Sequence, residues 1–212
     1  MYFVLLLLAL LVTSPKVTAT KSSSCAPFSS SMIEFASGFE EPSPPLVKDE
    51  YTANFIQHKW NQNLSHITAG HISNLPSLDI VLVDEASDDG LASSLFNYAN
   101  TSQDGLVDNT LSTYSSTSSS VEVWRGYVNP AFPLFSRDFL VTNKAIFGGL
   151  VKRRFYENFV ASWNIMYQGA IPVTVYVDNC NSVVGYDFFT TGERTKAITE
   201  YFNIQANASS TA

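Results

Sequence analysis

The sequence predicts a mainly β protein with a few helices (α+β), in which short helices cap one large curved antiparallel sheet or unclosed barrel. Two observations carry this prediction. Short runs rich in β-branched and aromatic residues make up most of the chain after residue 50, as expected for strands. Turn signals such as Asp88-Asp89-Gly90 separate these runs at short spacing, which is typical of antiparallel sheets.

The N-terminus has the pattern of a secretory signal peptide. An apolar run over residues 2–12 is followed by Pro15 and by small residues at 17–19. The run is too short for a bilayer, which needs ~20 apolar residues, and small residues suit a signal-peptidase site. We therefore expect cleavage after Ala19 and a secreted, extracellular protein; an uncleaved anchor is the alternative. No later stretch is apolar enough to predict a transmembrane segment.

A serine-rich leader follows and ends in a proline-rich stretch. Inside it, Ser31 as an N-cap and Glu34 three residues later predict a short helix over residues 31–41. The C-terminal residues are polar and predict a disordered tail. The chain thus divides into a signal peptide (1–19), a polar leader and linker (20–45), a single β-rich domain (46–204) and a disordered tail (205–212).

The first half of the domain consists of predicted strands. Residues 78–86 form a continuous β-branched run, so we expect that strand to be covered on both faces. The serine-rich stretch 115–120 has no apolar anchor, which predicts an exposed, protease-sensitive hairpin tip. The strands expected here are residues 51–60, 66–73, 78–86, 91–100 and 121–128.

The second half contains one predicted helix and several more strands. Ser136 as an N-cap and Gly148-Gly149 as a stop predict a short helix. Residues 150–169 are compatible with a helix or with paired strands. Residues 191–204 are also compatible with either, but their β-branched and aromatic content favours a strand.

Residues 170–189 predict a β-hairpin with Cys180 at its turn. Val173, Val175 and Val177 share one face of its first strand, because side chains alternate along a strand. This face must cover something apolar, which is either a packed core or a hollow under a curved sheet.

Cys25 and Cys180 are the two cysteines of the chain. An oxidising compartment favours their pairing, so we predict a disulfide that ties the leader to the hairpin turn. The alternative is a free reactive thiol, although neither cysteine has a histidine or basic residue near it in sequence to lower its pKa.

The surface chemistry is acidic. The net charge is −7, and the one basic cluster is the trio at 152–154, which argues against a nucleic-acid partner. Three Asn-X-Ser/Thr sequons predict glycosylation in a secreted chain, at Asn63, Asn100 and Asn207. The sequence does not indicate an oligomeric state.

No catalytic or metal-binding motif is evident. The chain lacks a Gly-x-Ser-x-Gly elbow, a His-Glu-x-x-His motif and a phosphate-binding loop. His58, His66 and His71 precede acidic residues at 84–89, but this spacing matches no compact metal motif. We therefore predict no catalytic residue, no metal ligand and no cofactor.

The strand patterns "YTANFIQHKWN", "AGHI", "IVLVDEA" and "SLFNYAN" resemble the lipoprotein-carrier superfamily (LolA-, LolB- and LppX-like). The Ala-x-Phe-x-Gln strand of that family is matched over residues 53–57. The resemblance implies an unclosed antiparallel barrel, capped by helices, that holds an acyl chain. The chain departs from the family in having no lipobox before Cys25 and "DDGLASSLFNY" in place of an aromatic stretch.

These observations favour a secreted, non-enzymatic binding protein that holds an apolar, lipid-like ligand under a curved sheet. We expect residues 132–147 to close the concave face. Phe135, Trp163 and Tyr167 are the predicted ligand-binding residues, chosen for their aromatic character and their place near that segment. The alternative is a secreted enzyme, or a cell-surface or extracellular interaction protein, with a site that is not visible in sequence.

Overall fold

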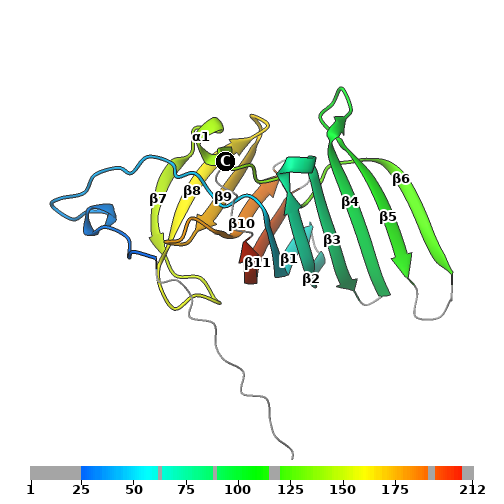
Figure 1. The fold of residues 1–212 in the computed structure, drawn as a ribbon, viewed down its shortest axis with the longest axis horizontal. Helices are drawn as coiled ribbons and strands as arrows, with labels where there is room; N and C mark the ends of the chain where they lie inside the picture. The colour runs from blue at the N-terminus through cyan, green and yellow to red at the C-terminus, as the bar shows by residue number, and fades with distance from the viewer. Residues whose placement is uncertain (1–24, 62–63, 88–89, 115–119, 191–193, 207–212) are drawn as a thin grey trace, which may run out of the picture.

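The computed structural model describes residues 25–61, 64–87, 90–114, 120–190 and 194–206, and the structural statements below concern these residues. They form one sheet of eleven strands, one short helix and two 3-10 turns (Figure 1). The helix is α1 (Phe139–Thr142), and the turns are η1 (Ser30–Met32) and η2 (Pro76–Leu78). The strands are β1 (Tyr51–Asn61), β2 (Leu64–Leu75), β3 (Ile80–Ser87), β4 (Gly90–Thr101), β5 (Val107–Tyr114), β6 (Val121–Val128), β7 (Ile146–Val151), β8 (Val160–Tyr167), β9 (Ile171–Val177), β10 (Val183–Thr190) and β11 (Thr195–Ala206).

The sheet is antiparallel throughout and is not closed. Its strand order is β6-β5-β4-β3-β2-β1-β11-β10-β9-β8-β7, so β6 and β7 are its two edges. Two meanders, β1–β6 and β7–β11, meet where the first strand pairs with the last over Tyr51–Ala206 to Asn61–Thr195. The predicted fold class, a mainly β chain with a large unclosed antiparallel sheet, is confirmed. No helix in the described part of the chain is long and apolar enough to cross a membrane.

Both predicted helices are shorter than expected. The helix predicted over residues 31–41 is the turn η1, and Ser29 rather than Ser31 caps it. This segment buries no side chain, and a short helix without a packed face is marginal in water. The helix predicted after Ser136 is the single turn α1, because the chain then enters β7, where Phe147 is buried and pairs with β8.

The two ambiguous segments are strands. Residues 160–167 form β8, which pairs with β7 and β9. Residues 195–206 form β11, as their composition favoured. The hairpin predicted over residues 170–189 is also confirmed, with β9 and β10 on either side of Cys180.

The sheet has one extensively covered face, which we call the core face, and the opposite face carries only a small buried cluster of Val160, Tyr176 and Val184. Strand alternation places Phe55, Val175 and Tyr186 on it, and each is 0% exposed. The opposite face is called the outer face. In β3, Val81 and Val83 are buried on the core face, whereas Asp84 and Ala86 are exposed. The prediction that this strand is covered on both faces is therefore wrong, because no second layer from the described residues packs on its outer side.

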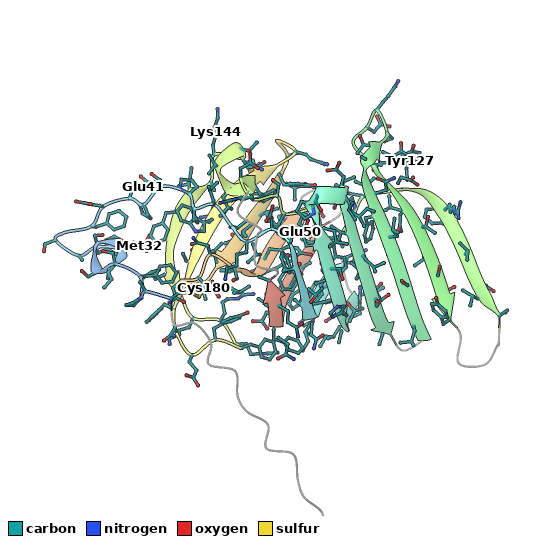
Figure 2. The ribbon with its side chains drawn as sticks, in the orientation of Figure 1. Met32, Glu41, Glu50, Tyr127, Lys144 and Cys180 are labelled. Atoms are coloured by element: carbon teal, nitrogen blue, oxygen red, sulfur yellow. A yellow bond between two sulfur atoms is a disulfide. The ribbon has the colours of Figure 1, made fainter. Side chains whose placement is uncertain are left out.

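A disulfide joins Cys25 to Cys180, with their Cα atoms 5.3 Å apart, which confirms the predicted pairing. Asp178 shapes the turn, because its Oδ1 accepts hydrogen bonds from the backbone N–H groups of Cys180 and Ser182, both at 2.8 Å. The side chain of Asn179 donates to the carbonyl oxygen of Cys25 at 3.0 Å. The leader is thereby fastened to one end of the molecule, opposite the half that holds Tyr127 (Figure 2).

Candidate functional site

Residues 129–145 form a second layer on the core face, and we call them the covering segment. One asparagine from the sheet holds their irregular backbone. The Asn74 side chain donates to the carbonyl oxygen of Phe135 at 2.8 Å, and its Oδ1 accepts from the Phe135 N–H at 3.1 Å. It also donates to the carbonyl of Asp49 at 2.5 Å. Because Asn74 is 0% exposed, these bonds replace those that a regular element would supply.

Two tyrosines hold the start of the covering segment. The Tyr186 hydroxyl donates to the carbonyl oxygen of Ala131 at 2.6 Å, and the Tyr98 hydroxyl donates to that of Phe132 at 2.5 Å. Burial raises the pKa of both phenols well above its ordinary value. Both hydroxyls therefore keep their protons and remain donors over the physiological pH range.

Aromatic contacts also attach the covering segment to the sheet. Phe132 packs edge-on against Phe55 of β1, with ring centroids 5.0 Å apart. Phe135 contacts Phe139 at 5.0 Å and Tyr186 at 5.7 Å. Such pairs add to the free energy of ordinary apolar burial, so the covering segment is bound to the sheet by both polar and aromatic contacts.

A cavity of about 90 Å³ lies between the covering segment and the sheet, and it is partly open to solvent. Pro130, Ala131 and Pro133 line it from the covering segment. Its remaining apolar wall comes from α1, β8, β9 and β10, through Phe139, Tyr167, Ile171, Val173, Tyr186 and Phe188. Burial raises the pKa of the Tyr167 phenol, so this wall carries no charge at neutral pH.

The polar part of the cavity is small. Lys59, Thr190, Thr195 and Asn129 line it. Thr195 is 3% exposed, and its Oγ1 has no hydrogen-bond partner in the described part of the chain. Among the lining residues that the structure describes, there is no carboxylate, thiol or imidazole. Most of the lining is apolar, and the few polar groups gather around Lys59 and Thr195.

The structure separates the three predicted ligand-binding residues. Tyr167 lines the cavity. Phe135 and Trp163 are 0% and 2% exposed and belong to the packed core, and neither lines the cavity. Trp163 packs against Phe147, with ring centroids 5.3 Å apart. A role of these residues in ligand binding stays a prediction.

Sequence reasoning missed Lys59 as a lining residue. Lys59 lies two and four residues after Gln57 and Phe55 on β1, so all three share the core face. Alternation along residues 51–60 is therefore the sequence signal that could have placed Lys59 on the core face. The other lining residues come from the covering segment and from β8, β9, β10 and β11, and only long-range contacts bring them together.

Of the three predicted glycosylation sites, one falls in the described part of the chain. Asn100 is exposed; its side chain donates to Asp108 Oδ2 at 2.9 Å and accepts from the Tyr127 hydroxyl at 3.0 Å. Asn63 and Asn207 lie outside the described residues, as do the signal peptide and residues 115–119 of the predicted hairpin tip. No group of three or more potential metal-ligating side chains occurs in the described residues.

The sequence matches no known family model and no curated protein. Solved structures similar to this chain include a DUF1329 family protein from Desulfovibrio piger, at 7% identity over 76% of this chain and 87% of that one, with a TM-score of 0.34. PNGF-II shows 9% identity over 75% of this chain and 28% of that one, with a TM-score of 0.33.

A domain described as a candidate outer membrane lipoprotein-sorting protein, from Vibrio parahaemolyticus, is also similar. Its identity is 10% over 78% of this chain and 88% of that one, with a TM-score of 0.24. A lipoprotein-sorting domain is thus among the structural neighbours. At such low TM-scores, none of the three similarities carries an argument about function.

Proposed function

We propose that this protein is a secreted, non-enzymatic binding protein that holds an apolar, lipid-like ligand between its sheet and the covering segment. The cavity under the covering segment is the observation that carries the proposal. Sites for small ligands are typically concave and mostly apolar, with a few polar groups that orient the ligand. The cavity has this composition, and its opening lets part of a ligand extend into solvent.

Burial of methylene groups supplies the affinity. Each buried methylene contributes ~0.8 kcal/mol, so a few of them inserted among Phe139, Ile171 and Phe188 yield several kcal/mol. The cavity of about 90 Å³ is small, so the inserted part of the ligand is a short stretch of chain. The rest of the core face beside the cavity is filled by the protein's own side chains. The ligand therefore occupies only a small part of this face.

Secretion is part of the proposal. The disulfide between Cys25 and Cys180 is compatible with an extracellular or periplasmic location, because disulfides persist in oxidising compartments. The signal-peptide pattern over residues 1–19 supports the same location.

A cavity-filling pair of variants tests the function. Ile171→Trp adds bulk to a residue that lines the cavity, whereas Met166→Trp adds it to an outer-face residue of β8 that is 53% exposed. A fluorescent fatty acid is titrated into the mature, delipidated chain and into both variants. We expect saturable binding by the wild type and by Met166→Trp, and at least tenfold weaker binding by Ile171→Trp. No saturable binding by the wild type would overturn the proposal.

A further inference from the structure

We propose that the ligand is an amphiphile with an anionic oxygen head group, a carboxylate or a phosphate, and that Lys59 and the Thr195 hydroxyl hold this head group at the polar end of the cavity. The inference rests on the proposed binding function and adds the chemical class of the ligand. It follows from the placement of one cation and one unpartnered hydroxyl beside an apolar wall.

Lys59 brings a positive charge to the covered side of the sheet. It lies on the core face of β1 and lines the cavity. In the described part of the chain, no hydrogen bond or ion pair of its ammonium group is found, whereas Arg153 and Arg154 both pair with carboxylates. A partly buried charge is costly without a partner, so a ligand with a negative group fits this place.

Thr195 is the second, independent indication. Its side chain lines the cavity, and its Oγ1 is buried without a partner. The neighbouring Thr190, directly opposite on β10, donates its own hydroxyl to the carbonyl oxygen of Thr195 at 3.5 Å. The Thr195 hydroxyl is therefore left to donate to a group inside the cavity, because buried polar atoms are normally hydrogen-bonded.

The acidic side chain near Lys59 does not form an ion pair with its ammonium group. Glu85 on β3 interacts electrostatically with Lys59 and His66 but forms no ion pair with either. Burial raises the pKa of Glu85 above its ordinary value, and the two basic residues oppose this shift. The net charge of −7 disfavours anions at a distance, but salt screens that repulsion beyond ~8 Å.

Lys196 provides a matched control. It follows Thr195 in sequence but points to the outer face, where its ammonium group lies 5.9 Å from the centroid of the Trp60 ring. Replacing either lysine with methionine removes the same charge and keeps an unbranched apolar stem. A difference between Lys59→Met and Lys196→Met therefore reports on the cavity rather than on net charge.

The test uses isothermal titration calorimetry with dodecanoate, dodecyl phosphate and dodecanol, each kept as monomers. We expect the mature wild type to bind at least one anion about tenfold or more tightly than the alcohol, as charge-assisted hydrogen bonds would allow. Lys59→Met should lose this preference, and Lys196→Met should keep it. Thr195→Val, which keeps the side-chain shape, should weaken binding of the anion more than binding of the alcohol.

The outcomes are separable. Stronger binding of dodecanoate identifies a fatty-acid head group, and stronger binding of dodecyl phosphate identifies a phosphate ester. Equal binding of all three ligands by the wild type, or equal losses in both lysine variants, would overturn the head-group assignment and leave the binding function intact. Failure of all three to bind would overturn both. Circular dichroism and thermal unfolding of each variant confirm that the chain is folded.

Discussion

The two halves of the sheet have the same alternating strands but different burial. Over β1 and β7–β11, the leader and the covering segment form a second layer, and core-face residues such as Phe55 and Val175 are 0% exposed. At the other end of the sheet, Phe96 of β4 and Val107 of β5 still belong to the core, but β6 and the adjoining ends of β4 and β5 extend beyond this layer and form what we call the uncovered half (Figure 1). There, Trp124 on the same face is 48% exposed. Alternation therefore decides which side chains share a face, and the second layer decides which face becomes a core.

The uncovered half is also apolar on its outer face. Leu91, Tyr114, Val123 and Tyr127 are all exposed there. The ring of Trp124 on the core face lies directly over Gly126, where an added Cβ would come within 2.5 Å of it. The tryptophan thus covers the glycine of an edge strand, a known way to stabilise such a strand locally.

The largest expected effect is in the covered half. Phe135→Ala removes a 0% exposed ring that contacts Phe139 and Tyr186. Large-to-small changes of this kind cost about 3–5 kcal/mol of unfolding free energy. Chemical denaturation of the mature protein measures the loss, and a cost below about 1 kcal/mol would show that the covering segment is not part of the stable core.

Loss of the disulfide should cause the second-largest decrease in the free energy of unfolding. Replacing Cys25 and Cys180 together with alanine opens a link across a sequence separation of 155 residues. The chain-entropy argument gives up to ~4–5 kcal/mol for a loop of this size, and measured values are usually ~2–4 kcal/mol. Denaturation of the double variant, compared with that of the disulfide-bonded wild type, gives the value. An unchanged midpoint would mean that the leader does not contribute to the covered half.

Asn74→Ala should have a smaller but more local effect. It leaves the N–H and carbonyl groups of Phe135 buried without partners, at a cost of about 1–3 kcal/mol. Asn54→Ala on the outer face of β1 is the control, because it removes a single exposed hydrogen bond to His71. Hydrogen exchange should become faster in residues 129–145 of the Asn74 variant and remain unchanged in the control.

The smallest effect is expected in the uncovered half. Trp124→Ala removes a half-exposed ring, and we expect a loss of no more than about 1 kcal/mol, near the range of surface substitutions. A loss as large as that of Phe135→Ala would mean that the edge strand β6 is covered in solution, by another molecule or another copy of the chain. Sedimentation analysis of the wild type would then distinguish these two cases.

Local rules predicted the strands well. Alternation correctly placed Val173, Val175 and Val177 on one buried face, and cysteine counting gave the disulfide. The same rules failed for the helices. The apolar residues after Ser136 are buried by packing on the sheet, and this packing does not require a longer helix. Long-range contacts decide that outcome, as in the bonds between Asn74 and Phe135, which are 61 residues apart.

The cavity was even less accessible to sequence reasoning. Aromatic character selected Phe135 and Trp163, but pockets and cores share the same composition. Only the pairing of β1 with β11 brings Lys59 next to Ala197 and near Thr195. No short-range pattern in either strand indicates that pairing.

The seam between β1 and β11 also bears on biogenesis. The strands β1–β6 pair with their neighbours in sequence and can assemble as the chain emerges. The middle of the finished sheet, however, joins Tyr51 to Ala206. Contacts of such high sequence separation form slowly, so the sheet is complete only after almost the whole chain has been synthesised. Until then β1 has an unpaired edge, and an edge of this kind is prone to pair with other chains.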